Sequence, residues 1–143
     1  DWWTEEDAKN FEKRADVMVA FFDSIEVAPG VHANGRMTLG ENIADHGGLQ
    51  VSFQAFKNAT EAAPLEIVDG FTPEQRFFLA YANVWAGNIR PEEILRLTKL
   101  DPHSLGKWRV DGALPHIQNW YEAFKITEQD SMFVPKEKRV SIW

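Results

Sequence analysis

Two carboxylates four residues apart are the first feature of this sequence that could do chemistry. Residues 38–48 read Thr-Leu-Gly-Glu-Asn-Ile-Ala-Asp-His-Gly-Gly, so Glu41 and Asp45 would lie one turn apart on one face of a helix. Because two acids this close repel each other, they favour a positive partner. A metal ion with histidine ligands would serve: one carboxylate could bind the ion while the other holds a ligand histidine through its second ring nitrogen.

A structural interpretation of the same residues stays open. Glu41 follows Thr38 by three residues, which is the spacing of a capping box at the start of a helix. In that case Asp45 would be a solvated surface acid. The two interpretations differ in what surrounds the carboxylates, which spacing alone does not reveal.

A second polar segment, residues 101–109, combines an acid, a histidine and an arginine. Asp101 precedes His103 by two residues, and Arg109 follows His103 by six. An imidazole held by a carboxylate keeps its orientation and is suited to stabilising an oxyanion. The forked donors of Arg109 could bind a carbonyl or a carboxylate. The alternative is a loop with a surface histidine and a structural arginine.

These side chains need a helical scaffold, and the apolar periodicity supplies one. The sequence predicts a helix from Thr4 that ends before Pro29, a loop or short hairpin over 29–37, a buried helix over about 38–58, helices opening at Thr72 and Pro91, an aperiodic stretch over 101–112, helical spacing again from Ile117 to Phe124, and an irregular tail over 127–143.

Composition bounds the class of protein. The 143 residues are 44% hydrophobic and 13% aromatic, which is enough for one ordered domain with a sizeable core. A formal charge of -7 argues against nucleic-acid or anionic-membrane partners. Charges interrupt every hydrophobic stretch before 18 residues, so no membrane span is predicted. There is no cysteine for a disulfide or a thiolate metal site.

Several motifs along the whole chain resemble those of neprilysin-like zinc peptidases. In order, they are Asp1-Trp2-Trp3-Thr4 before an acidic helix, Leu39-Gly40-Glu41-Asn42-Ile43-Ala44-Asp45 with Gly47-Gly48, Ala82-Asn83-Val84-Trp85, Asp101-Pro102-His103-Ser104 with Arg109-Val110, and a final Trp143. The Glu-Asn-x-Ala-Asp run is among the more specific motifs of that family.

The resemblance implies a role for each polar residue. Glu41 would be the third zinc ligand, and Asp45 would orient a zinc-binding histidine. His103 would stabilise the tetrahedral intermediate while Asp101 holds its ring. Arg109 would bind the carbonyl of the residue that follows the cleaved bond.

The HExxH helix of the family is not in this sequence. That helix supplies two zinc histidines and the glutamate that activates water. The histidines here are His32, His46, His103 and His116, and no two are four residues apart. By the resemblance, the chain would begin just after that helix. We therefore expect no stable zinc binding and no hydrolysis by this chain without an upstream HExxH segment.

Other departures concern cysteines and histidines. Vertebrate relatives carry paired cysteines at the positions of Ala86 and Val140, so their absence points to a bacterial member. We expect a hydrogen-bonded, non-ligand role for His46, and structural or exposed positions for His32 and His116. The tryptophans and phenylalanines should pack in the core, with Trp143 as a buried C-terminal anchor.

Together these observations predict a mainly α protein: a single domain over 1–143 that forms the helical C-terminal lobe of a thermolysin-like (gluzincin) zinc peptidase. The predicted activity is zinc-dependent endopeptidase action on oligopeptides, with one zinc ion. The alternatives are a non-catalytic helical interaction domain and a pseudo-enzyme whose upstream segment lacks the histidines. The predicted location is the bacterial cell envelope or the extracellular space, with the cytoplasm as the alternative.

Overall fold

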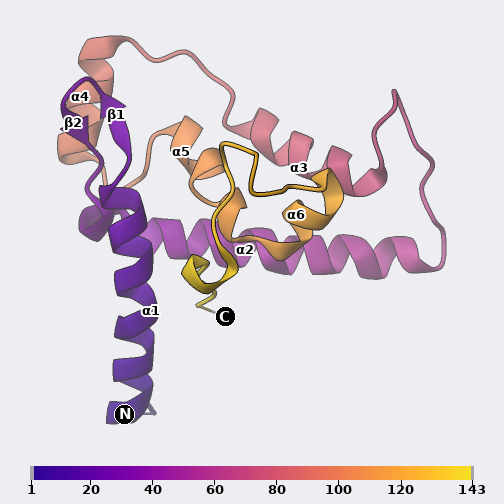
Figure 1. Ribbon diagram of the computed structural model, residues 1–143, viewed down its shortest axis with the longest axis horizontal. Helices are drawn as coiled ribbons and strands as arrows, with labels where there is room; N and C mark the ends of the chain where they lie inside the picture. The colour runs from indigo at the N-terminus through magenta and orange to yellow at the C-terminus, as the bar shows by residue number, and fades with distance from the viewer. Residues whose placement is uncertain (1, 143) are drawn as a thin grey trace.

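The computed structural model describes residues 2–142 and confirms a mainly helical protein (Figure 1). Its elements in chain order are α1 (Glu5–Asp23), β1 (Glu26–Ala28), β2 (Val31–His32), α2 (Gly35–Glu61), α3 (Pro73–Val84), α4 (Pro91–Leu100), α5 (Gly106–Asp111), the 3-10 turn η1 (Leu114–His116), α6 (Gln118–Phe124) and the 3-10 turn η2 (Lys136–Lys138).

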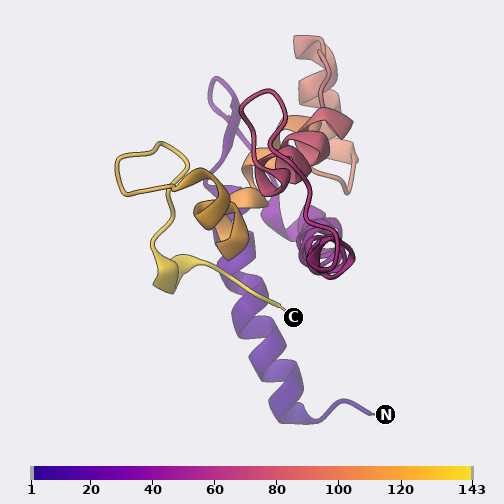
Figure 2. The same ribbon diagram turned by 90° about the vertical axis from the view of Figure 1, so that its right-hand side faces the viewer.

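Helix α1 begins at the predicted position because Thr4 and Asp7 form a reciprocal capping box. Its predicted inner face is buried at Ala15, Met18 and Phe22. The N-terminal half of α1 projects away from the other helices in both views (Figures 1 and 2). After α1, strands β1 and β2 pair antiparallel, so a short hairpin is present, but it spans 26–32 rather than the predicted 29–37, and residues 35–37 already belong to α2.

Helix α2 is longer than predicted at both ends. Asn34 is its N-cap, with the side chain accepting a hydrogen bond from the Met37 N–H, so the helix begins at Gly35 and runs to Glu61. Thr38 lies inside the helix, so the capping-box interpretation of Thr38 and Glu41 is wrong. A Cβ on Gly35 would lie 2.3 Å from the Val19 carbonyl oxygen, so glycine permits α1 and α2 to cross closely here.

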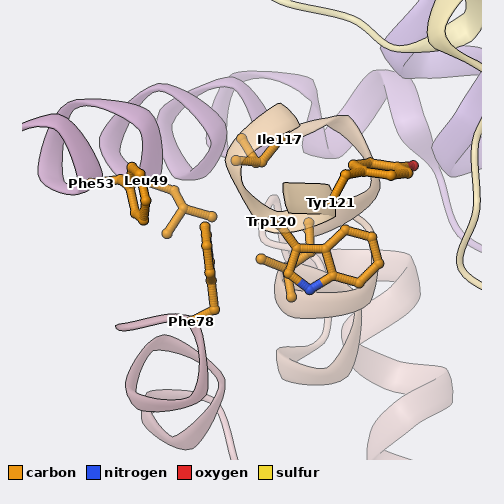
Figure 3. Close-up of a cluster of buried hydrophobic side chains, with 7 residues drawn as sticks. Leu49, Phe53, Phe78, Ile117, Trp120 and Tyr121 are labelled. Carbon is orange, nitrogen blue, oxygen red and sulfur yellow. The ribbon is translucent and has the colours of Figure 1, made fainter. Parts of the chain in front are cut away.

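The main core joins α2, α3, η1 and α6. Phe53 and Phe78 stack with ring centroids 5.1 Å apart, and Ile117 and Trp120 close the other side (Figure 3). The buried members of this cluster are Leu49, Phe53, Phe78, Leu114, Ile117, Trp120 and Tyr121. The helical spacing over 117–124 therefore correctly predicted a packed helix.

A second, smaller core lies where α1 crosses α2. Its buried members are Met18, Phe22, Ile25, Ile43 and Val140. Two tryptophans contradict the prediction that the aromatic residues are buried: Trp2 is 85% exposed and Trp3 is 41% exposed. Trp143 lies outside the described residues, so its predicted anchor role has no structural description.

The segment predicted to be aperiodic contains a short helix, α5, from Gly106 to Asp111. This helix is only six residues long, too short to show a period, and it crosses close to the chain after α3. A Cβ on Gly106 would lie 2.9 Å from the Trp85 carbonyl oxygen. The loop and helix over 101–111 are thereby held against α2 and the end of α3.

Candidate active site

Glu41 of α2 lies opposite His103, which belongs to the loop before α5. The Oε2 atom of Glu41 is 3.4 Å from Nε2 of His103, and both side chains are a little under half exposed, at 44% and 45%. The carboxylate is therefore open to an additional ligand. Glu41 and His103 are 62 residues apart in the chain, so only the fold brings the two groups together.

Asp101 fixes the orientation of the His103 ring from the side opposite Glu41. Its Oδ1 accepts hydrogen bonds from the backbone N–H of His103 at 2.9 Å and from the ring Nδ1 at 2.7 Å. These bonds, the backbone bond first and the ring bond second, lower the pKa of Asp101 below its usual value. With Nδ1 occupied by Asp101, Nε2 of His103 points toward Glu41.

One turn along α2, Asp45 forms a bidentate pair with Arg109 of α5. Nε of Arg109 donates to Oδ2 and Nη2 donates to Oδ1, each at 2.6 Å, and both side chains are at most 15% exposed. These hydrogen bonds raise the pKa of Arg109 above its usual value. Arg109 is thus the positive partner that the spacing of Glu41 and Asp45 called for, and it comes from the chain itself.

Two aromatic residues of the α3 region support the arginine. The Trp85 ring lies 3.8 Å from the guanidinium carbon of Arg109, and the Tyr81 hydroxyl donates to the Arg109 carbonyl at 2.9 Å. Burial and, to a lesser extent, the Asp45 charge raise the pKa of Tyr81 to about 12, so it remains a neutral donor. The sequence did not predict either contact. Trp85 was noted only as part of the family motif, and Tyr81 only as part of the apolar face of the helix that begins after Thr72.

A further pair was missed: the Ser104 hydroxyl donates to Oδ1 of Asn42 at 2.7 Å. Together these contacts form what we call the polar seam, the facing sets Glu41, Asn42 and Asp45 of α2 and His103, Ser104 and Arg109 of the 101–111 segment. Next to the seam is an open depression of about 290 Å³ whose lining includes apolar Trp85, Ile89 and Leu97 beside His103 and Arg109.

The remaining histidines lie away from the seam. His46 is 1% exposed, and within residues 2–142 neither ring nitrogen makes a hydrogen bond of good geometry, although the backbone of His116 lies near enough to affect its pKa. Its ring lies 6.1 Å from that of His116, which is also buried and whose Nδ1 accepts from the Val140 N–H at 3.2 Å. His32 is exposed in β2, as expected.

The seam offers one carboxylate that is accessible and not held by an arginine, that of Glu41. Within residues 2–142, no group of three or more His, Cys, Asp or Glu side chains is placed to hold a metal ion. A catalytic zinc requires three protein ligands and accepts carboxylate and imidazole. The donor chemistry of Glu41 therefore fits zinc, and this part of the chain supplies a fraction of such a site.

Comparison with known proteins decides the family. The sequence profile of peptidase family M13 matches residues 1–140. The chain belongs to peptidase family M13. This confirms the resemblance drawn from the motifs at Glu41 and His103.

Relatives and solved structures agree with this assignment. Human and rabbit neprilysin are each 36% identical to the chain over 148 residues, which is 100% of this chain and 20% of the relative. The inhibitor-bound zinc metalloprotease Zmp1 of Mycobacterium tuberculosis superposes with a TM-score of 0.94 at 32% identity, covering 100% of this chain and 23% of Zmp1. PepO from Lactobacillus rhamnosis superposes over 99% of this chain and 21% of PepO, with a TM-score of 0.81 and 32% identity.

The chain thus spans about a fifth of the length of the M13 relatives it matches. Its helices match the corresponding helical region of the two bacterial proteases. None of the helices over residues 2–142 combines the length and the apolar character needed to cross a membrane, as the interrupted hydrophobic stretches predicted.

Proposed function

We propose that this chain forms one wall of the active site of a zinc-dependent endopeptidase that acts on oligopeptides. The observation that carries the proposal is the polar seam in a chain of family M13: Glu41 faces His103 at 3.4 Å, and one turn away Asp45 fixes Arg109. Zmp1 of Mycobacterium tuberculosis and PepO of Lactobacillus rhamnosis, two solved structures that the chain matches, are both bacterial, which supports a bacterial source for this one as well.

In this proposal Glu41 is a zinc ligand, and the other ligands come from an HExxH segment outside this sequence. The bound ion would polarise the peptide carbonyl and activate water. Glu41 is suited to this because its carboxylate is 44% exposed and its contact with His103, at 3.4 Å, is longer than a strong hydrogen bond.

His103 and Arg109 would act on the substrate. Asp101 holds His103 by Nδ1, so Nε2, which lies on the Glu41 side of the ring, could donate to the oxyanion that forms when the peptide carbonyl is attacked. Arg109 has five N–H donors, of which Asp45 takes two, so others can bind the carbonyl of the residue after the cleaved bond. The depression beside Arg109 offers an apolar surface to a substrate side chain.

The role proposed for Asp45 extends to a zinc-binding histidine. Both of its oxygens already accept from Arg109, yet a carboxylate has further lone pairs that could hold an imidazole N–H. Asp45 would then link the metal side of the site to the substrate side. The proposed location, the bacterial envelope or alternatively the cytoplasm, is tested by fractionating cells and assaying each fraction for the protein.

The test uses the full-length protein that carries this chain, a quenched fluorescent oligopeptide, and metal analysis. The parent should contain about one zinc per molecule and cleave the peptide internally. Glu41→Gln should lose most of the zinc and at least about a hundredfold in kcat/KM, because one of three ligands is removed.

Glu12→Gln is the matched control, since Glu12 is an exposed acid on α1, and it should retain zinc and activity. A parent protein that binds no zinc and cleaves no peptide would refute the proposal in favour of an interaction domain or a pseudo-enzyme. Full activity of Glu41→Gln would refute the role of Glu41.

A further inference from the structure

A chain of hydrogen bonds runs along α2 and ends in the polar seam, at Asn42 and Ser104. The Thr38 hydroxyl donates to the Asn34 carbonyl at 3.0 Å, and Nδ2 of Asn42 donates to the Thr38 hydroxyl oxygen at 2.9 Å. This chain of hydrogen bonds leaves the helix at its last step, where the Ser104 hydroxyl donates to Oδ1 of Asn42 at 2.7 Å. Thr38 and Asn42 are 5% and 3% exposed, so the bond between them is shielded from water, whereas the bonds to Asn34 and Ser104 are part-buried.

The direction of this chain of hydrogen bonds is fixed from its backbone end. Because the Thr38 O–H is directed at the Asn34 carbonyl, the oxygen of that hydroxyl presents a lone pair to Asn42. The amide of Asn42 must therefore turn its NH₂ toward Thr38 and its carbonyl oxygen toward Ser104. Only a side chain with a donor and an acceptor at its tip can do both, and a buried Oδ1 without Ser104 would be costly.

Two consecutive residues of α2 meet two consecutive residues of the loop. Glu41 faces His103, and Asn42 is bonded to Ser104. The first pair is nearly half exposed and 3.4 Å apart, so it is too weak to position itself. The second pair is short and neutral, and its Asn42 end is anchored in the helix interior by Thr38.

We infer that Asn42 and Ser104 are positioning residues that set the placement of His103 relative to Glu41. This inference rests on the proposed peptidase function for its kinetic consequence, but its structural part stands without it. Asp101 fixes the rotation of the His103 ring, and Asn42 fixes the distance of the loop from α2 through the next residue. A misplacement of about 1 Å at a reacting group can cost up to about a hundredfold in rate.

The kinetic test measures kcat and KM of the full-length protein with Ser104→Ala. We expect kcat to fall about ten- to a hundredfold with KM changed less than about threefold, because His103 acts on the transition state rather than on bound substrate. Ser104→Thr keeps the hydroxyl and should restore most of the rate. Ser52→Ala is the matched control: the Ser52 hydroxyl bonds only within α2, to the Gly48 and Leu49 carbonyls, and its loss should leave kcat unchanged.

A crystal structure of Ser104→Ala gives the second measurement, which does not depend on activity. We expect the 101–105 loop to move away from α2, so that His103 no longer lies near Glu41. A kcat equal to that of an active parent, or a structure with His103 still 3.4 Å from Glu41, would overturn the inference. If the parent itself cleaves no peptide, the proposed function fails and the crystal structure alone decides the positioning role.

Discussion

Asp45 and His46 are consecutive residues of α2, and the fold gives them opposite surroundings. Asp45 lies in the polar seam, where Arg109 neutralises its charge and donates two short hydrogen bonds to it. His46 turns to the other side of the helix, where its ring lies 6.1 Å from the His116 ring and no charged group pairs with it among residues 2–142. The seam keeps charged groups because they are paired, whereas burial lowers the pKa of both interior imidazoles and so disfavours their charged form.

The two buried histidines, on α2 and η1, also contact α1 and the C-terminal segment. The edge of Phe21 on α1 packs on the His116 ring with centroids 4.6 Å apart, and the Val140 N–H donates to it. Burial lowers the pKa of His46, an effect that the nearby backbone of His116 partly offsets. Burial, with smaller effects from His46 and from the positive charge of Arg139, lowers the pKa of His116 to about 4.

The largest expected effect on stability comes from breaking the charge pair of the seam. Arg109→Met removes the partner of Asp45 but keeps much of the side-chain volume, which leaves a carboxylate nearly buried without a counter-charge. We expect a loss of about 3 kcal/mol in the free energy of unfolding, measured by urea denaturation at pH 7.

The control for that experiment is Arg96→Met, which breaks the pair with Glu93 on the surface of α4. Since both of those side chains are well exposed, its urea midpoint should not change measurably. Equal effects of Arg109→Met and Arg96→Met would show that the seam is no more protected from water than the surface.

Acid should weaken the fold through the histidine pair. An ordinary histidine titrates near 6.5, whereas folding lowers the pKa of His116 to about 4, so the unfolded chain binds more protons between these values. This contribution to stability is complete above about pH 6.5 and is lost as the pH falls toward 4, by about 3 kcal/mol at most for His116. Urea denaturation across pH 7 to 4 measures the loss.

Carboxylates also titrate in the lower part of this range, so a variant must isolate the histidine. His116→Asn retains a side-chain acceptor for the Val140 N–H but has no proton to bind. Its stability should fall less steeply between pH 6.5 and 4 than that of the parent. If the unfolding free energy of the two proteins falls equally with pH, protonation of His116 does not contribute to the acid sensitivity of the fold.

The smallest effect is expected at the exposed end of the seam. Glu41→Gln removes a half-exposed charge that lies 3.4 Å from His103, so the unfolding free energy should change by less than about 1 kcal/mol. Combined with the zinc and activity measurements on the same variant, this stability measurement distinguishes a functional role of Glu41 from a structural one. A loss as large as that of Arg109→Met would instead make Glu41 a structural residue.

Several features of this protein could be predicted from local sequence. The capping box at Thr4, the proline-opened helices at Pro73 and Pro91, and the aromatic periodicity over 117–124 gave correct helices, because caps and periodicity act within a few residues. The same holds for Asp101 and His103, since a carboxylate two residues before a histidine can reach both its backbone N–H and its ring.

The tertiary structure decided which residues far apart in the sequence pair with each other. The pairing of Asp45 with Arg109 and that of Asn42 with Ser104 bridge 64 and 62 residues, and no local rule selects them. The close crossing of α1 and α2 at Gly35 is likewise a tertiary contact, between residues 16 positions apart. The burial of His46 depended on which side of α2 the C-terminal segments cover. Spacing along one helix can show that two acids need a positive neighbour, but only the packed fold shows which residue provides it.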